Sequence, residues 1–128
     1  MAVKFVVREK GNPSKPTEPK KWYATAKSSG EISFKDLSNE IAEGSTTVSD
    51  TDVLAVLNDL TKLLSRHLEA GEIVRFGDFG SFQVSVKSTG AETEKKFHAG
   101  QIIKSKINFR PGNDLRDMLL TLKYTKTY

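Results

Sequence analysis

The stretches Phe79-Gly80-Ser81-Phe82 and Phe109-Arg110-Pro111-Gly112 decide the fold of this chain, because each combines a glycine with phenylalanine. The first follows a long helical pattern, and the second opens a short one. Residues 83–110 carry six Lys or Arg side chains against two Glu, a net of +4. The sequence therefore predicts a helical body, a pair of strands and an extended basic arm.

Composition limits the kinds of protein that this chain can be. It has 128 residues, of which 37% are hydrophobic, and no cysteine. Its length predicts one domain with an appendage, and the low hydrophobic content favours burial through oligomerisation. The absence of cysteine excludes disulfides and fits a reducing cytoplasm. Neither a signal-peptide core nor an apolar run of membrane length is present, so we expect a cytoplasmic protein without a membrane partner.

The charges are segregated along the chain. Residues 1–30 hold seven Lys or Arg against two Glu, a net of +5, whereas residues 31–70 hold three against eight acids, a net of −5. Together with the basic stretch 83–110, this pattern predicts an acidic helical body and two basic extended regions. Such segregation points to a polyanion such as nucleic acid, although any single lysine is explained as well by ordinary solvated surface.

The N-terminal region has the pattern of a hairpin. Residues 3–8 are rich in β-branched side chains and predict a strand, and residues 22–26 predict a second one. Three prolines between positions 11 and 19 predict the loop that joins them. We therefore expect a basic β extension over residues 1–30 and a second domain over residues 31–128.

Two helices are expected to follow. Ser33 and Ser49 are the predicted N-caps, Gly44 ends the first helix, and Gly71 takes a left-handed conformation after the second. The second helix carries a broad apolar stripe, which favours a dimeric or deeply buried helix, although ordinary packing within one chain remains open. The stripe consists of Val53, Val56, Leu57, Leu60, Leu63, Leu64 and Leu68.

The remaining pattern predicts strands over residues 72–76, 81–87 and 102–109 and a final helix over 113–122. The polar arm covers about residues 87–104. Within its polar part, Phe97 is the one bulky apolar side chain.

Residues 33–122 resemble the bacterial histone-like HU/IHF family, whose hallmarks are Gly-Phe-Gly-Asn-Phe and Phe-Lys/Arg-Pro-Gly at this spacing. The N-terminal extension resembles the longer HU-like proteins of Bacteroides. The resemblance implies an α+β fold with a helical body, a small antiparallel sheet and a β-ribbon arm. It also implies a nucleoid-associated homodimer that organises, condenses or bends double-stranded DNA with little sequence specificity. Pairing with a related chain as a heterodimer remains open.

This sequence departs from the family at three places, and one of them is a single residue inserted between the first two helices, around Gly44 to Thr47. Asp78 stands where the family usually has glycine. The arm lacks the proline with which family members wedge between base steps and kink the duplex. Phe97 is then the one candidate wedge, and the alternative is that it packs against its own dimer.

The site residues implied by charge and by the resemblance fall into two groups. The predicted DNA-binding residues are basic and lie on the arm or at its base: Arg75, Lys87, Lys95, Lys96, Lys104, Lys106 and Arg110. The predicted dimer core is apolar and comes from the long helix and the strands: Leu57, Leu60, Leu64, Phe76, Phe79, Phe82 and Phe109.

Catalysis has little support in the sequence. His67 and His98 are the only histidines, and no Cys, His or Asp cluster has metal-ligand spacing. We expect no enzyme activity, no metal, no cofactor and no small-molecule substrate. The alternative to DNA binding is a dimeric HU-like scaffold for protein–protein interaction, which the missing arm proline and the acidic helices favour.

Overall fold

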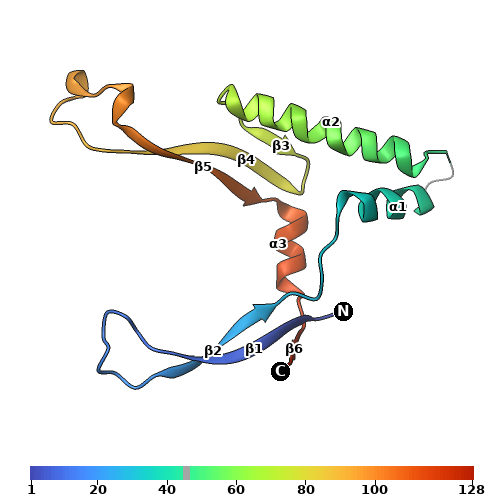
Figure 1. Cartoon of the computed structure of the whole chain (residues 1–128), viewed down its shortest axis with the longest axis horizontal. Coiled ribbons are helices and arrows are strands. Elements are labelled where there is room, and N and C mark those ends of the chain that lie inside the picture. The colour runs from blue at the N-terminus through green and yellow to red at the C-terminus, as the bar shows by residue number, and fades with distance from the viewer. Residues whose placement is uncertain (45–46) are drawn as a thin grey trace. The chain divides into compact units, whose positions relative to one another are not determined.

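The computed structural model describes residues 1–44 and 47–128 and has the predicted α+β class (Figure 1). Its residues form two compact units, one of Met1–Ser33 with Met118–Tyr128 and the other of Phe34–Asp117. The predicted domain boundary at residue 30 stays a prediction. In chain order the elements are β1 (Val3–Lys10), β2 (Lys21–Lys27), α1 (Phe34–Gly44), α2 (Asp50–Glu69), β3 (Val74–Phe76), β4 (Gly80–Ser88), η1 (Glu94–Lys96), η2 (Ala99–Gln101), β5 (Ile102–Pro111), α3 (Asn113–Leu120) and β6 (Tyr124–Lys126).

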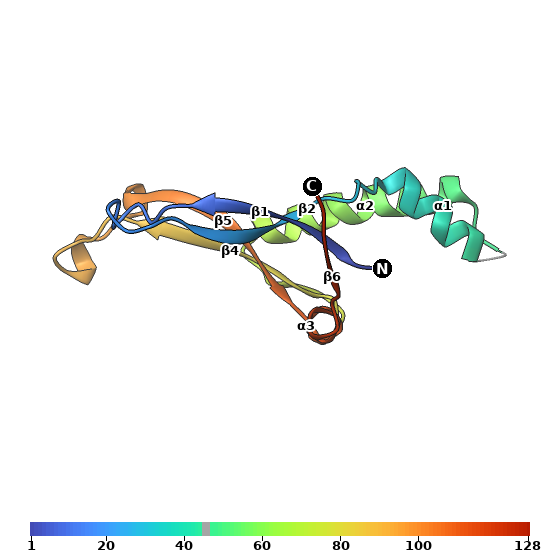
Figure 2. The ribbon, with the colours of Figure 1, turned by 90° about the horizontal axis from the view of Figure 1, so that it is seen from below.

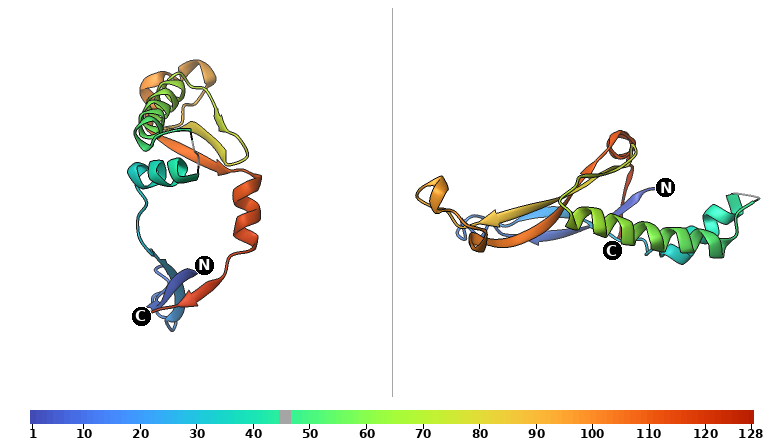
Figure 3. Two further views of the ribbon diagram at one scale, coloured as in Figure 1. Left: turned by 90° about the vertical axis from the view of Figure 1, so that its right-hand side faces the viewer. Right: turned by 90° about the horizontal axis from the view of Figure 1, so that it is seen from above.

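The first unit is a three-stranded sheet in the order β2-β1-β6. Strands β1 and β2 pair antiparallel from Lys4 opposite Lys27 to Lys10 opposite Lys21, which confirms the predicted hairpin. Strand β6 was not predicted. It runs parallel to β1 and is anchored by backbone bonds from Val3 N to the Lys123 carbonyl and from Thr127 N to the Phe5 carbonyl, both 2.8 Å. Figure 3 shows both ends of the chain in this sheet.

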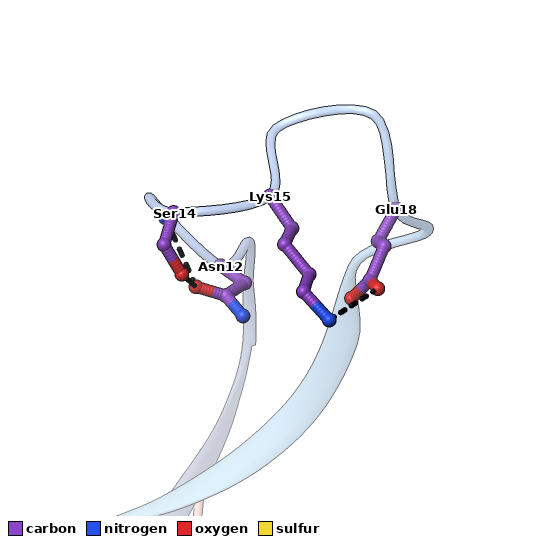
Figure 4. Close-up of polar contacts among 4 residues, drawn as sticks. All are labelled: Asn12, Ser14, Lys15 and Glu18. Atoms are coloured by element: carbon purple, nitrogen blue, oxygen red, sulfur yellow. Dashed lines mark hydrogen bonds and ion pairs between the residues drawn. The ribbon is translucent and has the colours of Figure 1, made fainter.

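The loop between β1 and β2 is held by short-range polar contacts (Figure 4). The Asn12 side-chain oxygen accepts hydrogen bonds from the Ser14 backbone N–H at 3.0 Å and from the Ser14 hydroxyl at 2.7 Å. A hydrogen bond from a backbone N–H to the side chain of an asparagine two residues earlier defines a turn. Lys15 then forms an ion pair with Glu18 at 3.5 Å. The predicted loop is therefore confirmed and has a defined local structure.

In the second unit, α1 and α2 follow the predicted signals. The Ser49 hydroxyl accepts a hydrogen bond from the Asp52 backbone N–H at 3.1 Å, so Ser49 is the N-cap of α2. Gly71 follows the C-cap with a φ of 81°, as predicted. Helix α1 begins directly after Ser33 and ends at Gly44, also as predicted.

Strands β3, β4 and β5 form a second antiparallel sheet in that order. Strands β4 and β5 lie side by side along their length as a ribbon (Figure 1 and Figure 2), with a register irregularity between Lys87 and Ser88. Helix α3 ends at Leu120, two residues before the predicted end, because a turn closed from Thr121 N to the Met118 carbonyl stops it. The prediction that this helix reaches Leu122 was therefore wrong.

Two glycines are required by close approaches at the junction of β4, β5 and α3. A Cβ on Gly80 would lie 2.6 Å from the Arg110 carbonyl oxygen and from the Phe109 ring. A Cβ on Gly112 would overlap the Asp78 carbonyl. Gly112 N instead donates to the Phe79 carbonyl at 2.8 Å, and Asp114 N donates to the Asp78 carbonyl at 3.2 Å. These contacts explain why both quoted stretches contain glycine.

A single chain buries very little apolar surface. Among the described residues, Val53 is the only apolar side chain that is buried, with 7% exposed. Ser38 is buried as well, and its hydroxyl donates to the Lys35 carbonyl at 2.8 Å. Along the predicted stripe of α2, Val56 and Leu63 are exposed and the others are half-buried or buried. The fold of one chain thus leaves an extended apolar surface in contact with water.

Candidate nucleic-acid interface

The register of β4 and β5 sorts their side chains onto two faces, because residues directly opposite each other point to the same side. The first face is apolar and includes the opposite pairs Phe82 with Phe109 and Val84 with Ile107. The second face, called here the basic face, is polar over its whole length. Its cross-strand pairs are Ser81 with Arg110, Gln83 with Asn108, Ser85 with Lys106, and Lys87 with Lys104, and Arg75 extends the first pair onto β3.

The lysines of the basic face are not neutralised. Lys87 and Lys104 lie directly opposite each other, and like charges in such a pair are unfavourable. They line one open groove with Val86 and Lys106. The ion pairs found in the described part of the chain involve none of these lysines. An anion placed in the groove would relieve the repulsion.

Arginines gather at the base of the ribbon. Arg75 and Arg110 flank Ser81 in one row across β3, β4 and β5. Arg75, Arg110 and Arg116 of α3 line one pocket of about 170 Å³. The Nε of Arg116 donates to the Pro111 carbonyl at 3.2 Å. Asp78 also lines this pocket and offsets part of the charge. Sequence reasoning missed Arg116, although its place six residues after Arg110 in the expected helix was a usable signal.

One serine hydroxyl of this face is buried rather than exposed. The Ser85 Oγ is buried and has no hydrogen-bond partner within the part of the chain that the structure describes. A buried hydroxyl without a partner is unfavourable, and this one is not accessible to an external acceptor. Ser85 lies opposite Lys106, beside the groove of the lysine pair.

The tip of the ribbon is a compact loop rather than a continuation of the strands. The Thr89 N–H donates to the Gln101 carbonyl at 2.9 Å, and the Gln101 side chain bridges back to the Gly90 carbonyl at 3.1 Å. Lys95 and Lys96 lie in the short helix η1, and Lys96 forms an ion pair with Glu92 at 3.2 Å. Phe97 follows directly and is 40% exposed. The predicted basic residues therefore divide between the basic face and this tip.

The predicted aromatic residues form one cluster within the chain. The ring centroids of Phe76 and Phe79 lie 5.8 Å apart, those of Phe79 and Phe109 5.7 Å, and those of Phe82 and Phe109 4.8 Å. These separations are typical of favourable aromatic pairs. Even so, Phe76, Phe79 and Phe109 each remain about two-fifths exposed.

The predicted leucines of α2 lie beside the same strands. Leu64 and Leu68 line an open apolar groove together with Phe82, Val84 and Ile107 of the apolar face. Leu57 and Leu60 are half-buried along the same helix. The groove is a surface that a second apolar element would fill, and the predicted dimer core stays a prediction.

Neither a metal site nor a transmembrane helix is found among residues 1–44 and 47–128. No group of three or more His, Cys, Asp or Glu side chains there could hold a metal ion. No helix there is long and apolar enough to cross a membrane. His67 instead lies 3.0 Å from the Glu72 carboxylate, close to the C-terminal end of α2.

Comparison with solved structures shows the fold. The structure of a protein from Bacteroides vulgatus, described provisionally as a bacterial DNA-binding protein, is similar over 98% of this chain, with a TM-score of 0.66 and 10% identity. This chain spans about half, 48%, of that protein's length. The HU protein of Anabaena, in a cocrystal with DNA, is similar over 70% of this chain and 99% of its own, with a TM-score of 0.54 and 18% identity.

Comparison with protein families shows the family of this chain. No curated protein matches the sequence. Residues 1–126 match the family described as an HU domain fused to a wHTH, Ig or glycine-rich motif. The match includes the N-terminal sheet as well as the unit with the ribbon, so the resemblance to HU-like proteins is confirmed for nearly the whole sequence. The chain belongs to this family of fused HU domains.

Proposed function

We propose that this protein is a histone-like DNA-binding protein that contacts duplex DNA through the basic face of the β3-β4-β5 sheet. The observation that carries the proposal is the row of Arg75, Arg110, Lys106 and the Lys87–Lys104 pair on one side of the sheet, none of which forms an ion pair within the described ranges. The HU protein of Anabaena, whose fold is similar, was crystallised with DNA, which supports the same ligand here. The role needs neither a catalytic group nor a cofactor, and it places the protein in the nucleoid.

The proposed contact is mainly to phosphates and carries little sequence information. Lysine and arginine side chains that neutralise phosphates release counterions, and this supplies affinity on any sequence. Gln83 and Asn108 are the amide side chains of the basic face, and they lie opposite each other. Bidentate amide and arginine contacts read base edges, and this face offers one amide pair with Arg75 and Arg110 at its base. With so few such groups, we expect weak specificity.

We propose further that two copies associate through the apolar surface that one chain exposes. Val56, Leu63, Phe76, Phe79 and Phe109 are all at least 39% exposed, whereas Val53 alone among apolar side chains in the described ranges is buried. A two-fold axis would bring the same patch of both copies together and close the groove beside Leu64. Association with a related chain would use the same surface.

Bending is expected to be weak. The arm tip has no proline, and its exposed apolar side chain is Phe97. Smooth bending of a short duplex costs on the order of 1–6 kcal/mol, which lysine contacts must offset. Energy transfer between the ends of a labelled duplex measures the bend. A Phe97→Ala variant should abolish whatever bend exists and keep the salt-dependent affinity, and a sharp bend that survives this change would contradict the assignment of Phe97.

The experiment that tests the function is a gel-shift series with linear, nicked and pre-bent duplexes across several salt concentrations. We expect binding to all three with similar affinity and a steep loss as salt rises. Sedimentation of the free protein gives its oligomeric state in the same buffers. A chain that binds none of the duplexes at low salt would contradict the proposal.

The second candidate function is an HU-like scaffold that binds other proteins. It is favoured by one observation, since the unit Phe34–Asp117 carries 11 Lys or Arg against 13 Asp or Glu, a net of −2. The two functions differ in their dependence on salt. Capture of a protein partner by a chain that does not shift DNA would favour the scaffold.

A further inference from the structure

The net positive charge of this protein resides in its terminal unit. Residues 1–33 and 118–128 carry nine Lys or Arg against three Glu, a net of +6, whereas residues 34–117 have a net of −2. The proposed DNA surface thus belongs to the unit without excess positive charge. The excess positive charge of the unit that contains the sheet β2-β1-β6 is therefore separate from the proposed DNA surface.

The register of β1 and β2 makes their hairpin amphipathic, and one of its faces is basic. Lys10 lies opposite Lys21, Arg8 opposite Tyr23, and Lys4 opposite Lys27. The other face carries the opposite pairs Phe5 with Ala26 and Val7 with Ala24, together with Val3. Cations therefore recur along one side of the hairpin, with Arg8 two residues from Lys10 and four from Lys4, and the pair Val6 with Thr25 lies between Arg8 and Lys4. Two residues along a strand span roughly 7 Å.

Two like-charge pairs on this face oppose folding of the hairpin. Lysines directly opposite each other in a sheet repel, and this arrangement occurs at Lys4–Lys27 and again at Lys10–Lys21. No acidic side chain in the described ranges forms an ion pair with these residues or with Arg8. Lys27 does donate to the Tyr128 carbonyl at 3.4 Å, but this bond leaves its charge in place.

In the loop of the hairpin, by contrast, one lysine is neutralised by an acidic side chain. Lys15 forms an ion pair with Glu18 (Figure 4). Glu9 lies opposite Trp22, so alternation places it on the other face from the cations. The acids of this segment are therefore placed away from the basic face, which is left to an external anion.

We propose that this face of the β1–β2 hairpin, formed by Lys4, Arg8, Lys10, Lys21 and Lys27, is a second DNA-binding surface that contacts the phosphate backbone of a duplex. Tyr23 lies among these cations and is 49% exposed, so its ring and hydroxyl are available to the sugar-phosphate backbone. The inference shares its ligand, duplex DNA, with the proposed function and assigns that ligand to a different surface. A protein with two such surfaces holds either two segments of one duplex or two duplexes.

The test uses the full chain and three double variants with the same loss of charge. The hairpin variant is Lys10→Gln with Lys21→Gln, and the ribbon variant is Lys87→Gln with Lys104→Gln. The matched control is Lys35→Gln with Lys62→Gln, because both of these lysines are exposed on helices. The dissociation constant of each protein for one linear duplex is measured across a salt series.

We expect the hairpin variant to lower the magnitude of the slope of the log binding constant against log salt by about 2 units, since each phosphate contact contributes about 0.9. The control should leave this slope unchanged. The melting temperature of the hairpin variant should stay equal or rise, because the variant removes a repulsive pair. Should it fall instead, Lys10→Arg with Lys21→Arg keeps the charge, and restored binding would assign the loss to electrostatics.

Other results separate failure of this inference from failure of the proposed function. An unchanged slope in the hairpin variant with a lowered slope in the ribbon variant overturns the second surface and leaves the proposed function standing. Unchanged slopes in both variants overturn both. A hairpin variant that loses binding to phosphatidylserine vesicles while its binding to DNA is intact overturns the assignment of DNA to this face.

Discussion

The β1–β2 hairpin and the β4–β5 ribbon are built on the same plan and differ in the elements beside them. Both are antiparallel, and both place lysines directly opposite each other, at Lys10–Lys21 in the hairpin and at Lys87–Lys104 in the ribbon. The hairpin is completed within its own unit by β6. The apolar face of the ribbon meets α2 only along an open groove. Charge placement is therefore set by register in both, whereas we expect dependence on a second copy for the ribbon, because its Phe82 and Phe109 belong to the predicted dimer core.

The largest expected effect tests this dependence. Phe79→Ala should cost about 3–5 kcal/mol of unfolding free energy, as for a buried aromatic, because the dimer would cover a ring that is 44% exposed in one chain. Denaturant unfolding at two protein concentrations measures this cost. Phe5→Ala in β1 is the control and should leave the dimer intact. A wild-type protein that sediments as a monomer at micromolar concentration would contradict the dimer.

A deletion of residues 1–30 removes the hairpin and tests how much it contributes to the stability of the rest of the chain. The truncated chain lacks β1 and β2 and leaves β6 without its partner strand. We expect a lower melting temperature with the dimer preserved, because the exposed apolar surface of α2 and the ribbon is kept. Calorimetry and sedimentation check both parts. An unchanged melting temperature would show that the terminal sheet adds no stability to the rest.

The ribbon pair is the next test. Lys87→Gln with Lys104→Gln should lower the magnitude of the salt slope by about 2 units and weaken binding on all sequences alike. Removal of the repulsive pair should leave stability equal or slightly higher, by less than about 1 kcal/mol. Gel-shift titrations on unrelated duplexes measure the first effect, and thermal melting measures the second. Losses confined to one sequence would move the contact toward base readout.

The smallest expected effect distinguishes two neighbours at the ribbon tip. Lys95→Ala should lower the salt slope by about 1 unit if Lys95 contacts a phosphate. Lys96→Ala should lower it less, because Lys96 already forms an ion pair with Glu92 at 3.2 Å. A Glu92→Gln variant removes that acid and should raise affinity. Equal losses for the two lysines would show that the ion pair opens on DNA.

Sequence patterns predicted the elements whose signals are local. Ser49 and Gly71 mark the two ends of α2, and both act as expected. The alternation of Phe82, Val84 and Val86 predicted β4. The stretches around Gly80 and Gly112 carried the resemblance that the family match confirms, and their close backbone contacts explain why glycine is needed at both positions.

The features that escaped prediction depend on distant partners. Strand β6 has only three residues, and its partner β1 lies at the other end of the sequence, so no local periodicity marks it. The lysine pairs could not be read from spacing, since register decides which residues face each other and β4–β5 has an irregularity at Lys87. The roles of the predicted DNA-binding and dimer residues likewise stay predictions, because they depend on molecules outside one chain.

The parallel pairing of β1 with β6 has a mechanical consequence. Val3 pairs with Tyr124 and Phe5 with Lys126, so a pull on residue 1 against residue 128 loads these hydrogen bonds in shear along the two strands. The bonds at Val3 and Thr127 would bear such a load together. Residues 34–117 are enclosed in sequence between the two paired strands and would carry no tension until that pairing breaks. The terminal sheet would thus shield the ribbon-bearing unit from force applied through the chain ends.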